Sequence, residues 1–133
     1  MVSRLWWFAD LLSESGRNPI QDWYEALPPE ARAEFDTTLQ YLANMKEWRR
    51  PEFDWLHGKR FSGIGEIRFK AGRIQYRPLG CVGTERSQFV SLLGCFKKGK
   101  NYTPRDSLNT AARRRDLFRA NPLNIEERDP YGS

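Results

Sequence analysis

Two runs of alternating polar and apolar residues, joined by one short connection, constrain the fold of this chain more than any other feature. They begin the stretch 65–98 and read GEIRFKAGRIQYR, with the connection at Ala71-Gly72. Alternation with a period of two on both sides of a two-residue connection that contains glycine predicts a β-hairpin. We therefore expect this segment to form two paired antiparallel strands.

The register of this hairpin follows from pairing residues outward from Ala71-Gly72. The five pairs are Lys70 with Arg73, Phe69 with Ile74, Arg68 with Gln75, Ile67 with Tyr76 and Glu66 with Arg77. Apolar residues then meet on one face and polar residues on the other, so the register is self-consistent. The polar side of this predicted hairpin carries four cations and one carboxylate. Like charges opposite one another destabilise a sheet, so a bound polyanion would explain why Lys70 faces Arg73.

Basic charge is concentrated in the same part of the chain. The net charge is +5, but residues 59–100 hold ten basic and two acidic side chains, a net charge of +8. Residues 1–58 hold six basic and ten acidic side chains, a net charge of −4. A concentrated basic surface is typical of proteins that bind phosphate groups. A solvated basic face that serves only solubility explains the charge equally well.

Length and composition indicate one folded unit. At 133 residues and 39% apolar content, we expect one domain over residues 1–120, followed by a polar, loosely held tail over 121–133. No apolar run approaches a membrane span and no signal peptide is recognisable, so we expect a cytoplasmic protein without a membrane partner. His57 is the single histidine, which argues against a histidine-based metal centre. We expect Cys95 to be a reduced core residue and Cys81 to lie in a loop.

Helix signals lie on both sides of the hairpin. Asn18-Pro19 provides a cap and a first helical residue, and Pro28-Pro29 separates that helix from a second one over 29–46. The last helix is predicted to start with Thr103 as its cap. Further strands are predicted over 4–9 and over 88–96, a central strand buried on both faces, with irregular structure over 47–61 and 79–87. The fold class is therefore α+β, a helical hairpin packed on a small, mainly antiparallel sheet with a C-terminal helix.

This order of elements resembles the RelE/ParE toxin superfamily, and most closely its HigB-type, phage-derived branch. The likeness rests on GEIRFKAGRIQYR, VSLLGCFKKGKNYTP and PRDSLNTAARRR, and it covers residues 23–118. The resemblance implies a RelE-like fold and a toxin of a type II toxin–antitoxin pair. Many such toxins are ribosome-dependent mRNA endonucleases in which the ribose 2′-hydroxyl attacks the adjacent phosphate. The implied partners are an antitoxin, the ribosome and mRNA, and no cofactor or metal is implied.

The resemblance also implies functional positions. It places functional cations at Arg68, Arg73, Lys97 and Lys98, puts Arg77 on the tyrosine-arginine strand and puts Tyr102 near a useful tyrosine of some members. We expect catalytic roles for a set of four residues, Arg68, Arg73, Lys98 and Tyr102. We expect RNA contacts from six more cations, Lys59, Arg60, Lys70, Arg77, Lys97 and Lys100.

Cleavage by an internal 2′-hydroxyl requires stabilised charge on the phosphate and transfer of a proton. Arginine side chains suit the first task, because the planar guanidinium matches phosphate oxygens. Lys98 or Lys97 is the candidate acid or base, and Tyr102 is a candidate donor to the leaving oxygen. For Glu66, the one carboxylate on the basic face, an ion pair with Arg77 is favoured over a role as base.

Two other classes of function remain open from the sequence. Many relatives carry histidine where this chain has Gly94-Cys95, and no residue is an obvious general base. ParE-type members poison DNA gyrase without cutting RNA, and similarity of fold does not decide between these activities. A nucleic-acid-binding module without toxicity is the third interpretation.

Overall fold

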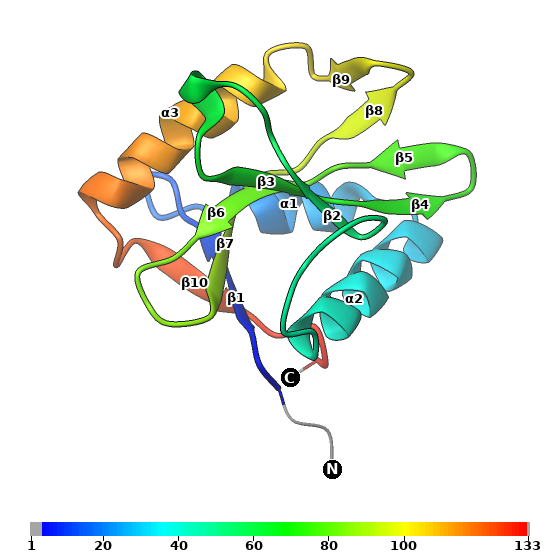
Figure 1. The fold of residues 1–133 in the computed structure, drawn as a ribbon, viewed down its shortest axis with the longest axis horizontal. Coiled ribbons are helices and arrows are strands. Elements are labelled where there is room, and N and C mark those ends of the chain that lie inside the picture. Colours follow the sequence, from blue (N-terminus) through cyan, green and yellow to red (C-terminus); the bar gives the residue numbers. More distant parts are fainter. Residues whose placement is uncertain (1–3, 133) are drawn as a thin grey trace.

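Three α-helices pack around two β-sheets in the computed structural model, which describes residues 4–132 (Figure 1). The helices are α1 (Pro19–Ala26), α2 (Pro29–Ala43) and α3 (Ser107–Ala120), and one turn of 3-10 helix, η1, spans Lys59–Phe61. The Asn18 side chain caps α1 by accepting a hydrogen bond from the Gln21 amide at 2.9 Å. The α+β class and the helical hairpin are confirmed, although α2 ends before residue 46. Within residues 4–132, every helix is too short or too polar to span a lipid bilayer.

The larger sheet has six strands in the order β10-β1-β7-β6-β3-β2. Their bounds are Trp7–Leu11 for β1, Phe53–Trp55 for β2, Ile64–Ile67 for β3, Leu79–Val82 for β6, Gln88–Leu93 for β7 and Ile125–Arg128 for β10. β1 runs parallel to β7, and the other pairs are antiparallel. β7 lies between β1 and β6, which confirms a central strand for the first part of the predicted segment 88–96. The prediction is wrong at its end, because Phe96 belongs to β8 in the smaller sheet.

The smaller sheet has four antiparallel strands in the order β4-β5-β8-β9. Their bounds are Phe69–Ala71 for β4, Ile74–Tyr76 for β5, Phe96–Lys98 for β8 and Asn101–Thr103 for β9. The chain passes between the sheets at three points, from β3 to β4 at Arg68, from β5 to β6 at Arg77-Pro78 and from β7 to β8 at Gly94-Cys95. The sheets are therefore joined along these crossings (Figure 1).

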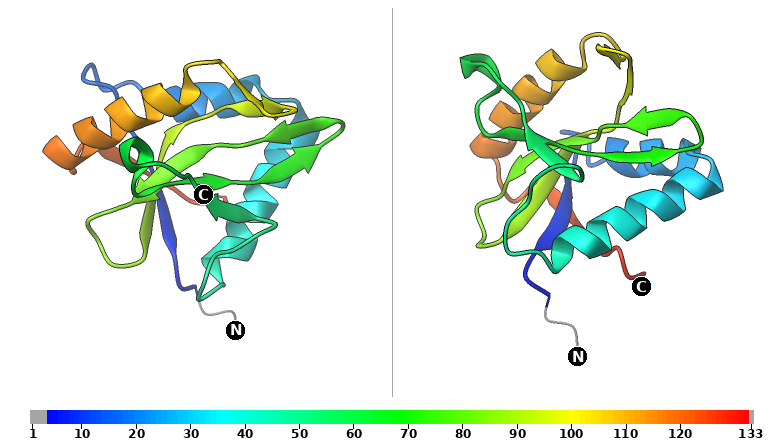
Figure 2. Two further views of the ribbon diagram at one scale, coloured as in Figure 1. Left: turned by 45° about the horizontal axis from the view of Figure 1, so that its top comes forward. Right: turned by 45° about the vertical axis from the view of Figure 1, so that its right-hand side comes forward.

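Apolar side chains are buried on both faces of the larger sheet. On one side, Phe35 of α2 lies in a core cluster with Phe8 and Phe89. On the other side, Phe118 of α3 packs with Val90, the residue that follows Phe89 in β7. Because successive strand residues point to opposite faces, one run of apolar residues contributes side chains to both cores. Figure 2 shows α2 and α3 on opposite sides of this sheet.

The predicted hairpin exists, but its predicted register is wrong. The pairs in the structure are Phe69 with Tyr76, Lys70 with Gln75 and Ala71 with Ile74, so the connection is Gly72-Arg73. Gly72 has φ +60°, a conformation that glycine adopts without steric cost, and this places it at the first position of the turn. The shift moves each partner by two residues, which keeps apolar opposite apolar. The alternation pattern therefore could not distinguish the two registers.

The segment 79–87 was predicted to be a loop, and this prediction is wrong for Leu79–Val82, which form β6. The loop prediction rested in part on the two glycines of this segment, Gly80 and Gly83. A Cβ atom on Gly80 would lie 2.5 Å from the Phe89 ring, so glycine is needed where that ring covers the strand. Cys81 is accordingly a buried strand residue, and Cys95 is buried as predicted.

Three further predictions also differ from the structure: the start of the last helix, the loose tail and the irregular segment 47–61. Thr103 belongs to β9, and α3 begins at Ser107, so Thr103 is not its cap. The predicted loose tail contains β10, which pairs with β1, and Arg128 donates two hydrogen bonds to the buried Asp10 carboxylate at 2.8 and 2.9 Å. The segment 47–61, predicted to be irregular, contains β2 and η1. Residue 133 lies outside the described part of the chain.

Candidate functional site

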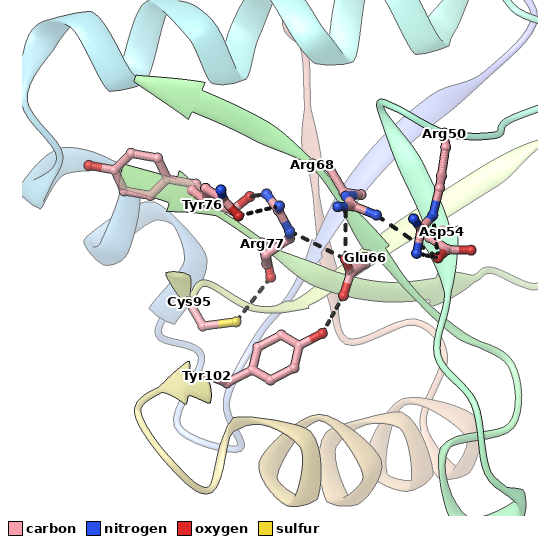
Figure 3. Close-up of polar contacts among 9 residues, drawn as sticks. Arg50, Asp54, Glu66, Arg68, Tyr76, Arg77, Cys95 and Tyr102 are labelled. Atoms are coloured by element: carbon pink, nitrogen blue, oxygen red, sulfur yellow. Dashed lines mark hydrogen bonds and ion pairs between the residues drawn. The ribbon is translucent and has the colours of Figure 1, made fainter. Parts of the chain in front are cut away.

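A buried carboxylate, Glu66 of β3, lies at the centre of a polar cluster where the two sheets meet (Figure 3). It is 5% exposed. One carboxylate oxygen, Oε2, is 3.3 Å from Nε of Arg77 and 3.6 Å from Nε of Arg68. The other, Oε1, accepts the hydroxyl hydrogen bond of Tyr102. The predicted ion pair between Glu66 and Arg77 is therefore confirmed.

The topology explains why these side chains meet. Arg68 and Arg77 occupy crossing points between the sheets, and these points are adjacent because β3 pairs with β6 and β4 pairs with β5. Tyr102 reaches Glu66 from β9, the edge strand of the smaller sheet. These residues lie in strands or in one- or two-residue connections between paired strands, which fixes their relative positions.

Arg77 is nearly fully buried, with 5% exposure. Its guanidinium donates to the Tyr76 carbonyl at 2.8 Å and to Oε1 of Gln75 at 2.9 Å. Burial, followed by the nearby positive charge of Arg68, lowers the pKa of Arg77. The surroundings hold this side chain inside the protein, so its expected role as a direct RNA contact would require a phosphate group to approach a buried guanidinium.

Arg68 is less buried and has a second acidic neighbour. Its Nη1 atom lies 4.0 Å from Oδ2 of Asp54, and its side chain is 23% exposed. Asp54 also accepts a hydrogen bond from Nε of Arg50 at 2.9 Å. That hydrogen bond is the largest cause of the lowered pKa of Asp54. Charges of opposite sign therefore alternate from Arg50 through Asp54 and Arg68 to Glu66.

One row of side chains crosses all four strands of the smaller sheet. Lys70 of β4 pairs with Gln75 of β5, Gln75 pairs with Lys97 of β8, and Lys97 pairs with Tyr102 of β9. Directly paired residues share a face of the sheet, so this row forms one polar surface. The ammonium group of Lys97 lies 5.0 Å from the centroid of the Tyr102 ring.

A shallow depression of about 270 Å³ opens beside this row. Its lining combines cations with the chain that precedes β2, and it consists of Pro51, Glu52, Arg68, Phe69, Lys70, Gln75 and Arg77. Three of the expected functional cations therefore border one concave surface. We call the row together with this depression the polar face.

The side chain of Tyr102 keeps its hydroxyl proton. Burial raises its pKa, and so does its hydrogen bond to Glu66. A tyrosine can donate one hydrogen bond through its hydroxyl group, and here it donates that bond to the Glu66 carboxylate. In this geometry Tyr102 offers other groups an acceptor, so donation to a leaving oxygen would require its bond to Glu66 to break first.

The structure brings together only some of the expected site residues. Arg68, Lys70, Arg77, Lys97 and Tyr102 belong to the polar face. The others lie elsewhere. Arg73 is exposed in the β4–β5 turn, Lys98 follows Lys97 and so projects from the opposite face of β8, and Lys100 is exposed in the β8–β9 connection. Lys59 and Arg60 lie in η1, where Nε of Arg60 donates to Asn109 of α3 at 3.0 Å.

Asp54, Arg50 and Gln75 are members or neighbours of the site that were not predicted from the sequence. Asp54 lies in the sequence Phe53-Asp54-Trp55, whose apolar–polar–apolar alternation is the strand signal that could have indicated β2. Among residues 4–132, no group of three or more histidine, cysteine, aspartate or glutamate side chains is arranged to hold a metal ion.

Comparison with known proteins identifies a family. The model of the family described as "Phage derived protein Gp49-like (DUF891)" matches residues 22–116, which include Glu66, Tyr102 and the whole polar face but neither β1 nor β10. No curated protein and no solved structure gives a significant match to this chain. Since the matched segment makes up well over half of the chain, the protein belongs to the phage-derived Gp49-like family, which is associated with RelE/HigB-like toxins.

Proposed function

We propose that this protein is the toxin of a type II toxin–antitoxin pair and that it cuts mRNA on the ribosome. The family supports the assignment as a toxin. The polar face is the single observation that carries the proposed cleavage, because it presents Arg68, Lys70 and Lys97 beside one depression. A phosphodiester backbone is the ligand that such a surface fits best.

In the proposed reaction, the ribose 2′-oxygen forms a bond to the adjacent phosphorus, and the bond from phosphorus to the 5′-oxygen breaks. Negative charge develops on the phosphate oxygens during this step. Arg68 and Lys70 border the depression and are placed to stabilise that charge. The loss of one such preorganised donor typically raises a barrier by about 3–4 kcal/mol.

We assign the proton transfer to Lys97 rather than to Lys98. Lys97 shares the row with Lys70 and Tyr102, whereas strand alternation directs Lys98 to the other side of the sheet. In this assignment Lys97 takes the proton from the 2′-hydroxyl or delivers one to the leaving 5′-oxygen. Lys100 and Arg73 are exposed in the turns of the smaller sheet, and Lys98 is exposed on its other side, so these three cations are assigned to peripheral contacts with RNA.

An acidic antitoxin is the proposed partner that controls this activity. The segment 59–100 carries a net charge of +8, so an acidic protein that covers the polar face would block phosphate binding by charge and by shape. Co-purification from cells that express the neighbouring genes should yield a small acidic protein bound to this chain. Recovery of the chain alone from such cells would count against the pairing.

Expression of the protein without a partner tests the proposed activity. We expect growth arrest and mRNA ends mapped within translated regions, with 2′,3′-cyclic or 3′-phosphate on one side of the cut and 5′-hydroxyl on the other. Arg68→Ala should abolish the cuts, and Arg113→Ala, which changes an exposed arginine of α3, is the matched control. We expect cleavage to persist in EDTA once the ribosome's own need for magnesium is controlled.

Three results would overturn this function. Intact mRNA together with broken DNA in arrested cells would indicate a gyrase-directed toxin. Intact nucleic acids with normal growth would indicate a binding module. Products with 5′-phosphate and 3′-hydroxyl ends would exclude attack by the 2′-hydroxyl.

A further inference from the structure

Two carboxylates face each other across β2 and β3. Asp54 and Glu66 are directly paired in the antiparallel register. Like charges in such a pair destabilise a sheet unless something compensates for them. Arg50 compensates Asp54 and Arg77 compensates Glu66 from one side each. Arg68 bridges the two acids, because its Nε lies 3.6 Å from Oε2 of Glu66 and its Nη1 lies 4.0 Å from Oδ2 of Asp54. One guanidinium group is thus held between two acids on neighbouring strands.

The surroundings of Glu66 do not suit a general base. Its side chain is 7% exposed, Oε2 faces the two guanidinium groups, and Oε1 accepts the Tyr102 hydroxyl hydrogen bond. A base needs a lone pair that the substrate proton can reach. A buried carboxylate that accepts one hydrogen bond and pairs with two guanidinium groups is instead suited to hold those three groups in place.

We propose that Glu66 is a positioning residue which, together with Asp54, fixes the guanidinium group of Arg68 at the edge of the depression in the polar face. This inference rests on the proposed cleavage, in which Arg68 faces the phosphate. Arginine presents its donors in a planar fork, and a fork that is already oriented loses less freedom when it binds. Arg68 is only partly buried, with 23% of its side chain exposed, so it can be anchored on one side and still bind on the other.

Single-turnover cleavage of mRNA on programmed ribosomes, measured across pH, tests this role. For Glu66→Gln we expect the rate to fall about 10²-fold, the loss typical of a misplaced reacting group. Asp54→Asn removes only the weaker anchor, so its loss should be smaller. Ribosome binding and the shape of the pH profile should be unchanged in both variants. Asp116→Asn is the matched control, because Asp116 pairs with Arg115 at 3.2 Å on α3, away from the polar face.

A second readout does not depend on cleavage. In nitrogen-15 NMR spectra of the free protein, the Nε–H group of Arg68, which faces Glu66, and its Nη–H groups, one of which faces Asp54, should exchange slowly with water in the wild type. Exchange should be faster at Nε–H in Glu66→Gln and at Nη–H in Asp54→Asn, and it should be unchanged in Asp116→Asn. If Glu66→Gln does not fold, Asp54→Asn carries the test, because Asp54 is partly exposed.

The outcomes separate the two proposals. If the wild type does not cut mRNA but the NMR signals change as expected, the cleavage function is wrong and the positioning of Arg68 stands. If the wild type cuts mRNA but Glu66→Gln removes one limb of the pH profile, Glu66 is the base and the positioning role is wrong. Unchanged exchange of the Arg68 group in both variants would also overturn it.

Discussion

The two sheets of this protein share a core on one side and differ on the other. The central strands of the six-stranded sheet are buried on both faces, with α2 packed on one face and α3 on the other. The four-stranded sheet contributes Phe69 and Tyr76 to the α2 core, while Lys70 and Gln75 on its other face are exposed. A sheet that needs only one buried face can expose charged groups on the other, whereas charged groups buried in the larger sheet are paired, as Asp10 is with Arg128.

In the proposed function, this difference assigns stability to one sheet and RNA binding to the other. The larger sheet supplies the rigid support, and the smaller sheet carries the cations. Glu66 lies at the junction, anchored in β3 of the larger sheet, yet its partners Arg68 and Tyr102 belong to the connection into β4 and to β9. Glu66 is fixed in the buried sheet, so its contacts restrict the positions of Arg68 and Tyr102 at the edge of the smaller sheet.

The largest expected effect tests whether the two sheets share one core. Phe69→Ala in β4 and Phe89→Ala in β7 should each lower the free energy of unfolding by about 3–5 kcal/mol, because each removes a buried ring. Urea denaturation followed by circular dichroism measures both. A loss under about 1 kcal/mol for Phe69→Ala alone, within the range of ordinary surface changes, would mean that the smaller sheet is not part of the core.

The next prediction concerns the far edge of the larger sheet. Asp10→Asn should lower the free energy of unfolding by about 3 kcal/mol, because it leaves the buried Arg128 guanidinium without its counter-charge. The matched control is Asp129→Asn, which breaks an exposed pair with Arg4 and should cost less than about 1 kcal/mol. Hydrogen exchange of the β10 amides would show whether this edge unfolds alone or with the four-stranded sheet.

Substitutions in the polar face are expected to lower activity without lowering stability. Lys97→Met should slow cleavage by at least about 10²-fold, the lower end of the range for proton transfer. Lys98→Met, one residue further along β8 but on the opposite face, is the control and should have a smaller effect. Both variants should change the free energy of unfolding by less than about 0.5 kcal/mol. Equal losses of activity would contradict the assignment of Lys97 by strand alternation.

The smallest effect is a pH dependence at the junction. The hydrogen bond from Arg50 lowers the pKa of Asp54 from its ordinary value of 3.8, so this carboxylate stabilises the folded state above that pH. The contribution is lost as pH falls through the lower folded-state pKa. Because Asp54 is partly exposed, Asp54→Asn should remove only about 0.2–1 kcal/mol at neutral pH. The difference between the wild type and the variant should shrink toward zero in acid, and a constant difference across pH would contradict this origin.

Sequence patterns with strong local causes predicted their elements well. Asn18-Pro19 and Pro28-Pro29 placed the starts of α1 and α2, because capping and proline geometry act within one turn. The apolar run 88–96 indicated a central strand, because such a run suits a strand covered on both faces, and that strand forms over Gln88–Leu93. Among the site residues, the ion pair of Glu66 with Arg77 was found correctly, although the hairpin pairing used to derive it is not the one that forms.

Other features depended on partners distant in sequence. The strand character of Leu79–Val82 depends on Phe89, whose ring needs the space left by Gly80. The order of the C-terminal segment depends on Asp10, which lies at the other end of the chain. No local pattern encodes such contacts, because a glycine or a charged residue has the same local preference whether or not its partner is present.

By itself, the sequence determined that this chain builds an α+β domain with a strongly basic hairpin segment, because periodicity, caps and charge are local properties. Only the tertiary structure decided which cations share a surface. Strand alternation separates Lys97 from Lys98 although they are neighbours in sequence, and the pairing of β8 with β9 joins Lys97 to Tyr102. The crossing between sheets gathers Arg68 and Arg77 around Glu66. Burial of that carboxylate forces its neighbours to pair with it, and this requirement sets the geometry of the site.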